Sequence, residues 1–280
     1  MCSSDLEEDA GKNIHDLRSD ASLVDLNRAG VPLLEIVSEP DVRSAGEAGS
    51  YLKTLRAILQ YLGICDGNME EGSFRCDANV SIRPEETSAL GTKVELKNLN
   101  SFKAVEKALE FEIFRQAEIL SAGAKLIQET RLWDPDREQT RSMRTKEFAH
   151  DYRYFPDPDL LPVVIDEEWI GKIRASLPEL PDARKARFIS QFNIPPYDAE
   201  LLTSRKDIAD YFESALTTHN NPKAIANWIT GDLFRRLKEL KRDETLYITD
   251  WPVPADHLAA MVAFIDEGKI SGKIAKTVFD

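Results

Sequence analysis

A strict alternation of apolar and polar residues from Phe74 to Arg83 places the strongest constraint on the fold. The apolar positions are Phe74, Cys76, Ala78, Val80 and Ile82, and polar residues occupy every position between them. A period of two predicts a β-strand with one buried face and one polar face. A second alternating run, residues 92–98, follows after a loop, so we expect the two strands to pair as a hairpin.

The residues around this hairpin predict a region of mixed strands and helices from about residue 6 to 150. Val31 to Val37 is typical of a buried strand. Ser44 and Glu47 form a capping box for a helix that a leucine stripe continues as far as Gly63. We expect a second helix from Ser101 to about Leu120. Two further strands are expected near residues 127–133 and 140–144, on either side of the turn 134–136.

From about residue 166 the pattern indicates a helical region of about six short helices. Asn221 and Pro222 have the residue types of an N-cap and a first helical position. Between the two regions, the segment from Asp151 to Pro156 is rich in aromatic residues. We expect it to be an ordered joint packed on the sheet. The predicted fold is thus an α+β domain with a mixed or antiparallel sheet, residues 1–165, followed by an all-α domain, residues 166–280.

Composition limits the function classes. The net charge of −13 argues against a nucleic-acid binder that uses a general basic surface, although local basic patches remain compatible with RNA contacts. The apolar runs are too short to span a bilayer. The three cysteines form no CxxC pair, which favours free thiols in a reducing, cytoplasmic compartment.

Carboxylates supply the first candidates for chemistry. Glu35 is predicted on the apolar face of the strand 31–37. There it would either form a structural ion pair with an arginine or act as a metal ligand. The cluster Glu7, Glu8 and Asp9 offers oxygen ligands of the kind that Mg²⁺ prefers, and a solvated acidic turn is the alternative. No phosphate loop, dinucleotide fingerprint or nucleophile elbow is present, so any ATP site is not of the P-loop type.

A second group of candidates lies on the polar face of the predicted hairpin. It carries opposite charges that would line a cleft or simply face solvent, and the pattern does not separate these alternatives. The members are Arg75, Asp77, Arg83, Lys93, Glu95 and Lys97.

Several long strings of the sequence resemble the GatB family, the B subunits of the tRNA-dependent amidotransferases. They are the segments 24–40 (VDLNRAGVPLLEIVSEP), 69–83 (MEEGSFRCDANVSIR), 95–102 (ELKNLNSF), 128–131 (QETR) and 151–156 (DYRYFP). The resemblance covers nearly the whole chain, from Leu6 to Phe279. It implies a cradle-shaped α/β domain that is followed by a helical domain and a tail domain.

The resemblance also implies an activity. Family members use ATP and Mg²⁺ to phosphorylate the side-chain carboxylate of Glu-tRNA(Gln) or Asp-tRNA(Asn), and ammonia then displaces the phosphate. Their partners in a heterotrimer are an amidase subunit, which releases the ammonia, and a small third subunit. This chain lacks the family's Gly-Leu-Glu-Val-His segment and its C-terminal tail domain, so we expect it to be a fragment. It also lacks the zinc-binding CxxC pair of some members.

The resemblance assigns roles to the candidates. Glu7, Glu8 and Glu35 match positions associated with Mg²⁺, and the implied catalytic set is Glu8, Glu35, Arg75, Asp77, Glu95 and Lys97. The tRNA would contact a local basic patch made of Arg235, Arg236, Lys238, Lys241 and Arg242. The alternative is that these residues form an ordinary solvated helix face. Two rival functions remain: a non-catalytic tRNA-binding or assembly module of the same complex, and an unrelated metal-dependent phosphotransferase.

Overall fold

The computed structural model describes residues 2–14, 23–145, 164–239 and 252–279. These residues divide into two compact units, Met1–Ala48 and Gly49–Asp280. The domain boundary that the residue pattern predicts near residue 165 stays a prediction. The aromatic segment 151–156 lies outside the described residues.

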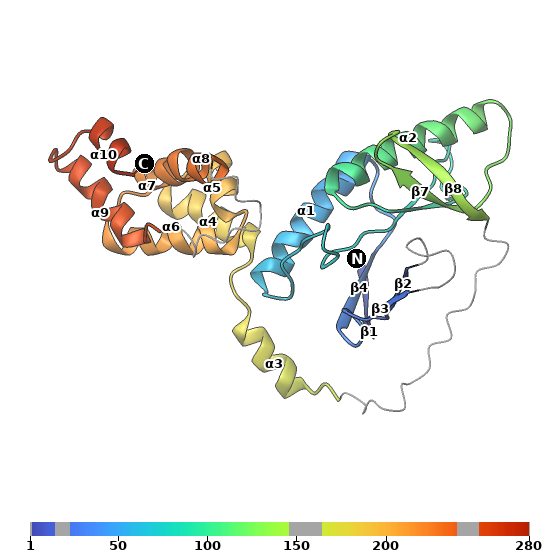
Figure 1. Cartoon of the computed structure of the whole chain (residues 1–280), viewed down its shortest axis with the longest axis horizontal. Helices are drawn as coiled ribbons and strands as arrows, with labels where there is room; N and C mark the ends of the chain where they lie inside the picture. Colours follow the sequence, from blue (N-terminus) through green and yellow to red (C-terminus); the bar gives the residue numbers. More distant parts are fainter. Residues whose placement is uncertain (1, 15–22, 146–163, 240–251, 280) are drawn as a thin grey trace. The chain divides into compact units, whose positions relative to one another are not determined.

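The first unit is built on two small antiparallel ladders (Figure 1). In one, β1 (Cys2–Glu8) pairs with β4 (Pro32–Ser38); in the other, β2 (Lys12–Ile14) pairs with β3 (Leu23–Asp25). The strand predicted at 31–37 is therefore present, but the expectation that it is buried is wrong. Val31 and Val37 are 45% and 47% exposed, and β4 has a single neighbouring strand, β1.

Helix α1 (Ala45–Tyr61) begins as its capping box predicts. The Glu47 amide donates to the Ser44 hydroxyl at 3.2 Å, and the Glu47 carboxylate accepts from the Arg43 amide. Gly63 follows the helix with a φ of +69°, a conformation that glycine adopts without steric cost.

A four-stranded sheet forms the centre of the second unit, in the order β5-β6-β7-β8. Strands β5 (Ala78–Val80) and β6 (Val94–Lys97) form the predicted antiparallel hairpin. The first strand is shorter than the run 74–83 predicted, yet exposure still alternates from Phe74 to Val80, with the apolar residues the less exposed at each step. The sequence period therefore fixes which side of the segment is buried even where no ladder forms.

Helix α2 (Phe102–Ser121) connects β6 to a parallel neighbour, β7 (Glu129–Asp134), which then pairs with β8 (Gln139–Thr145). Both strands and the helix were predicted. Ser101 caps the helix by accepting from the Ala104 amide at 3.1 Å. One face of α2 packs on the sheet through Val105, Leu109, Glu112 and Gln116, all buried.

The helical region is confirmed and is more finely divided than expected. Its elements are α3 (Glu167–Ser176), α4 (Pro181–Phe192), α5 (Pro196–Thr203), α6 (Lys206–Thr218), α7 (Pro222–Asn227), a π-helical segment (Trp228–Leu233), α8 (Phe234–Glu239), α9 (Ala255–Asp266) and α10 (Gly272–Phe279). Asn221 caps α7 and Pro222 opens it, as predicted.

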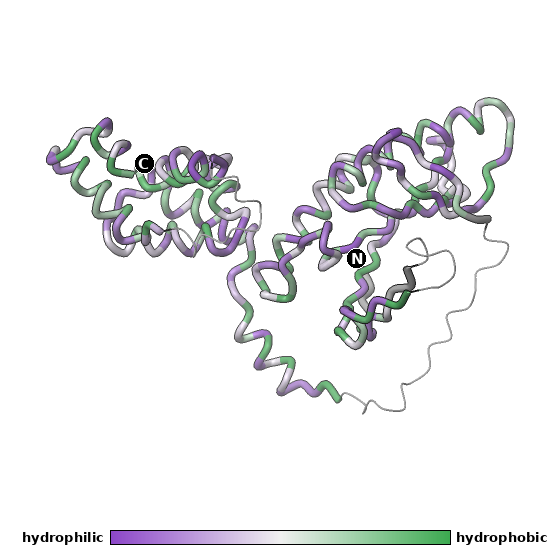
Figure 2. Tube along the Cα trace, in the orientation of Figure 1, coloured by the Kyte–Doolittle hydropathy of each residue, from purple (hydrophilic) through white to green (hydrophobic). Residues whose placement is uncertain are grey.

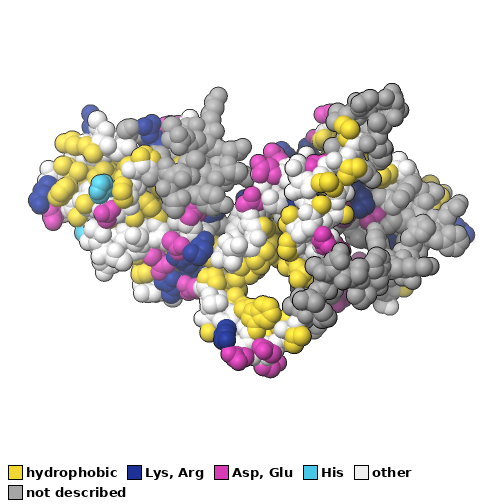
Figure 3. All heavy atoms as spheres, turned by 60° about the horizontal axis from the view of Figure 1, so that its bottom comes forward, with side chains coloured by type: hydrophobic (Ala, Val, Ile, Leu, Met, Phe, Trp, Pro, Cys, Tyr) yellow, Lys and Arg dark blue, Asp and Glu magenta, His cyan; other side chains and the backbone are white. Residues whose placement is uncertain are grey.

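The helices α4 to α10 share one core. Phe188, Leu202, Phe212 and Ile229 are completely buried in it, and Figure 2 shows apolar and polar positions alternating along these helices. Helix α3 is different because it buries no residue: Trp169 and Ile173 are 47% and 49% exposed. Figure 3 shows that hydrophobic side chains reach the surface of the molecule. Across the described ranges, no helix is both long and apolar enough to cross a membrane.

A buried hydrogen bond joins α1 to the helical region. The Tyr61 hydroxyl donates to the carbonyl of Thr203 at 2.9 Å, and the Tyr61 ring is 2% exposed. Burial raises the pKa of Tyr61 to about 12, although the charge of Arg184 opposes the shift.

Candidate functional site

The register of β1 and β4 places two of the three predicted metal ligands on one face. Glu7 lies opposite Leu33, and Glu35 lies two residues further along the same face of β4. Both glutamates are exposed. An exposed carboxylate keeps its hydration and needs no counter-ion. The ion pair was expected for Glu35 because burial was expected, and the exposure of Glu35 removes that reason.

Glu8, the third predicted ligand, lies on the other face because neighbouring strand residues point in opposite directions. Its carboxylate lies near Gly30, where an added Cβ would be 3.4 Å from Glu8 Oε1. Among the described residues, no three His, Cys, Asp or Glu side chains gather as a metal site. The metal roles of Glu7, Glu8 and Glu35 stay predictions.

Asp9, the last member of the acidic cluster, has a structural role. It is 8% exposed, and its Oδ2 accepts from Arg28 Nε at 2.9 Å. Its backbone also pairs with the turn, since its amide donates to the Val31 carbonyl and its carbonyl accepts from the Gly30 amide. A buried carboxylate with these partners holds the turn 26–31 against the end of β1.

The polar face of the hairpin brings three predicted residues together. Lys97 Nζ lies 2.6 Å from Asp77 Oδ2 and 3.4 Å from Glu95 Oε1, so one ammonium group joins two carboxylates. Partial burial works against the charge on Lys97, but Asp77 and Glu95 outweigh it and raise the pKa of the lysine. We call Asp77, Lys97 and Glu95, together with Thr130, the polar strip. Arg75 is exposed and its role stays a prediction.

Thr130 is the member of the polar strip that sequence reasoning missed. Its hydroxyl donates to Glu95 Oε2 at 2.7 Å, and the residue is 1% exposed. The parallel register sets Glu95 opposite Thr130 across β6 and β7. Thr130 lies inside the string QETR that supports the resemblance, but a single threonine on a strand gives no chemical signal of its own.

A second charged cluster lies on the opposite face of the sheet, under α2. Glu112 is fully buried and accepts from Arg115, Gln116 and Thr140. Arg131 donates to Glu129 at 2.8 Å and to both oxygens of Thr140. Burial would raise the pKa of Glu129, but hydrogen bonds from Ser142 and Arg131 and the charges of Arg131 and Arg115 hold it below its ordinary value. These partners make the cluster a structural element.

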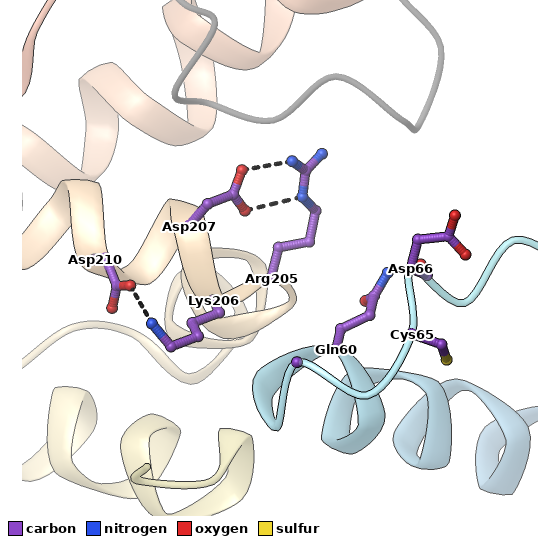
Figure 4. Close-up of a pocket in the computed structure, with 8 residues that line it drawn as sticks. Gln60, Cys65, Asp66, Arg205, Lys206, Asp207 and Asp210 are labelled. Atoms are coloured by element: carbon purple, nitrogen blue, oxygen red, sulfur yellow. Dashed lines mark hydrogen bonds and ion pairs between the residues drawn. The ribbon is translucent and has the colours of Figure 1, made fainter. Parts of the chain in front are cut away.

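A pocket of about 450 Å³ lies between the end of α1 and the start of α6 (Figure 4). Its two cations are already paired, Arg205 with Asp207 and Lys206 with Asp210. A phosphate group would have to compete with these carboxylates, so the pocket is a poor match to a nucleotide. Cys65 also lines it, and burial raises the pKa of this thiol.

The basic stretch predicted to bind tRNA belongs in part to α8. Arg235 and Arg236 both donate to Glu239, at 2.9 and 3.1 Å, and Lys238 is exposed. Lys241 and Arg242 lie outside the described residues. Ion pairing with Glu239 reduces the positive charge that α8 offers to RNA phosphates.

Comparisons with known proteins connect these elements to two families. The profile described as "GatB/GatE catalytic domain" matches residues 2–171, and the profile "GatB domain" matches residues 210–280. The first match contains Glu7, Glu35 and the whole polar strip.

Curated relatives match over nearly the whole chain. The B subunit of the aspartyl/glutamyl-tRNA(Asn/Gln) amidotransferase of Carboxydothermus hydrogenoformans is 56% identical over 278 residues, which are 98% of this chain and 57% of that protein. Proteins of the same name from Trichlorobacter lovleyi and Geotalea daltonii are 56% and 57% identical, with the same shares covered. The chain thus spans a little over half the length of these relatives.

Proposed function

Because the chain belongs to the family of the GatB/GatE catalytic domain, we propose that it is part of a GatB-type subunit of a tRNA-dependent amidotransferase. The observation that carries this proposal is the 56% identity to such a B subunit over 98% of the chain. The enzyme class is a ligase that forms carbon–nitrogen bonds with glutamine as the amido donor.

The proposed reaction has two steps. The γ-phosphoryl group of ATP is transferred to the side-chain carboxylate of Glu-tRNA(Gln) or Asp-tRNA(Asn), which releases ADP. Ammonia then attacks the activated carbonyl carbon and displaces phosphate, and Gln-tRNA(Gln) or Asn-tRNA(Asn) results. The ammonia is released from glutamine by an amidase subunit, in a heterotrimer that also contains a small third subunit.

Glu7 and Glu35 would hold the Mg²⁺ that this reaction uses. Mg²⁺ is commonly bound by one or two carboxylates together with substrate phosphates. Two exposed glutamates on the same face of the β1–β4 ladder fit that donor set. Bound there, the ion would neutralise charge that develops on the transferred phosphoryl group. Glu8 does not join this pair because its position in the register is on the other face.

The polar strip would serve the ammonia step. One lysine is shared by two carboxylates, so the surface is hydrophilic and carries one net negative charge. Such a surface can hydrogen-bond to a small neutral molecule and disfavours anions such as phosphate. This property favours the strip as a lining for ammonia over a role in holding nucleotide phosphates.

A non-catalytic tRNA-binding module of the same complex is the second candidate. The separation of Glu8 from Glu7 and Glu35 favours it, because the predicted three-carboxylate site is not formed by the described residues. In this case the protein would bind mischarged tRNA without turning over ATP.

The test uses the full-length protein assembled with its amidase and small partner subunits. Mischarged tRNA, ATP, Mg²⁺ and glutamine are supplied, and the aminoacyl group is identified after the tRNA is deacylated. The proposal predicts glutamine from Glu-tRNA(Gln), asparagine from Asp-tRNA(Asn), or both. Unchanged glutamate and aspartate, with normal glutamine hydrolysis by the amidase, would refute it.

A further inference from the structure

Exposure falls steadily along the polar strip. The side chains of Asp77, Lys97 and Glu95 are 51%, 36% and 19% exposed, and Thr130 is 1% exposed. The strip therefore runs from the surface into the sheet and ends at a buried hydroxyl. A buried hydroxyl that is bonded to a carboxylate is a fixed group, because it has no water to exchange with.

Glu95 is held from two sides. Thr130 Oγ1 donates to Oε2 at 2.7 Å, and Lys97 lies 3.4 Å from Oε1. The shorter contact is the better hydrogen bond, since O–H donors to carboxylates prefer this distance. Thr130 therefore fixes the orientation of the Glu95 carboxylate. Lys97 contacts both Glu95 and Asp77, so it links that orientation to the position of Asp77.

The strand pairing around Thr130 is irregular. The pairing of β7 with β8 shifts register between Thr130 and Arg131. Such irregularities redirect side chains and are frequent beside functional sites. Arg131, on the other face, is anchored to Thr140 at 2.8 Å, and Thr140 in turn donates to the buried Glu112. This anchoring holds β7 in the register that brings Thr130 to Glu95.

From these contacts we infer that Thr130 is a positioning residue for Glu95 in the amidation step. The inference rests on the proposed function, because it concerns the same polar strip. Thr130 does not touch the reacting atoms. It sets the orientation of Glu95, which in turn sets Lys97 and Asp77 along the path proposed for ammonia.

The test compares three variants of the full-length protein in its complex: Thr130→Val, Thr130→Ser and Glu95→Gln. Valine keeps the shape of threonine and removes the hydroxyl, whereas serine keeps the hydroxyl. We expect Thr130→Val to lower kcat for glutamine-dependent amidation about tenfold, since the lost bond is to a charged group. Thr130→Ser should stay within about twofold of the wild type, and the tRNA-dependent activation step should change less than amidation in Thr130→Val.

A double-mutant cycle separates positioning from stability. Thr130→Val combined with Glu95→Gln should be no slower than Glu95→Gln alone, because the hydroxyl acts only by orienting the charge that Glu95→Gln removes. The matched control is Thr203→Val, which also removes a buried hydroxyl, but one that donates to the Ala199 carbonyl within α5 and takes no part in the sheet. Its effect should add to that of Glu95→Gln. Where Thr130→Val lowers the unfolding midpoint, the proteins of the cycle are compared at a temperature below every midpoint.

Each outcome is informative. Normal amidation by Thr130→Val, or effects of Thr130→Val and Glu95→Gln that simply add, would overturn the positioning role while leaving the proposed function intact. Failure of the wild-type complex to amidate either tRNA would refute the proposed function instead. Rescue by serine together with non-additivity would establish the role.

Discussion

Glu35 illustrates how exposure changes the interpretation of a charged residue. The sequence places it on an apolar strand, where a lone carboxylate would require a partner in order to be buried. In the structure it faces solvent beside Glu7, and no desolvation cost arises. Removing its charge should therefore leave the fold intact, so an effect on activity would report on chemistry.

The first prediction is that Glu35 affects activity without affecting the fold. Glu35→Gln keeps the side-chain shape and removes one of two proposed ligand charges. We expect Mg²⁺-dependent phosphorylation of mischarged tRNA to fall more than about tenfold, a loss of about 1.4 kcal/mol or more in transition-state stabilisation. The measurement is the initial rate of phosphoryl transfer by the full-length complex across a Mg²⁺ titration.

Glu39→Gln is the matched control, because Glu39 is also exposed and follows the same strand. It should retain the wild-type rate. Equal rates for wild type and Glu35→Gln at limiting Mg²⁺ would show that Glu35 is not a ligand.

A second residue-scale prediction concerns Asp77 and Lys97. Replacing either by Ala interrupts the polar strip and leaves the strand face of Glu7 and Glu35 untouched. We expect glutamine-dependent amidation to decline more than ATP-dependent activation. Both rates are measured on the same complex, with free ammonium as an alternative donor that bypasses the path from the amidase. Equal losses in the two steps would argue for a role in the activation pocket or in folding.

At the scale of elements, the packing of α2 on the sheet depends on charges that are held in ionised form. The folded protein lowers the pKa of Glu129 from its ordinary value of 4.5. A group with a lower pKa in the folded state stabilises the fold fully above its unfolded pKa, and loses that contribution as the pH falls through the folded value. The α2–sheet contact should therefore weaken in acid.

Glu129→Gln tests this pH dependence. We expect the variant to be less stable than wild type at pH 7, and the difference to shrink as the pH falls below about 4.5. Urea unfolding of the full-length protein from pH 7 to 3 measures it. Glu118→Gln, on the exposed side of α2, is the control and should show no such trend. A difference that stays constant with pH would contradict the assignment.

Local signals predicted most elements, and tertiary context decided the rest. The caps at Ser44, Ser101 and Asn221 are local hydrogen bonds, so their residue types were enough to locate helix starts. The length of β5 depends on how far β6 runs beside it, which the alternation of its own residues does not encode.

The candidate site shows the same division. Lys97 and Glu95 were predicted together because they share one strand face, whereas the contact of Glu95 with Thr130 depends on the parallel pairing of β6 with β7, which α2 connects. Glu112 and Gln116 did carry a signal. They continue the helical spacing of Val105 and Leu109, and that spacing places them on the buried face.

At the scale of the molecule, Tyr61 connects α1 with the helical region. Tyr61→Phe removes the hydroxyl and leaves the buried Thr203 carbonyl without this donor. We expect the full-length protein to lose about 1–3 kcal/mol of stability in urea unfolding, the usual cost of an unsatisfied buried polar group.

Tyr197→Phe is the control, since Tyr197 is 73% exposed and surface changes usually stay within about 0.5 kcal/mol. Equal unfolding midpoints for Tyr61→Phe and the control would mean that the hydrogen bond from Tyr61 to Thr203 contributes nothing to the free energy of unfolding.

We propose that the full-length protein itself activates the carboxylate of a mischarged tRNA. The most direct measurement is phosphate transfer from γ-labelled ATP, catalysed by the full-length protein in its complex, with Glu-tRNA(Gln) or Asp-tRNA(Asn) and without any ammonia donor. We expect ATP turnover that depends on one or both mischarged tRNAs and on Mg²⁺, and that is reduced by Glu35→Gln. ATP turnover that is absent, or that is the same with uncharged tRNA, would contradict it.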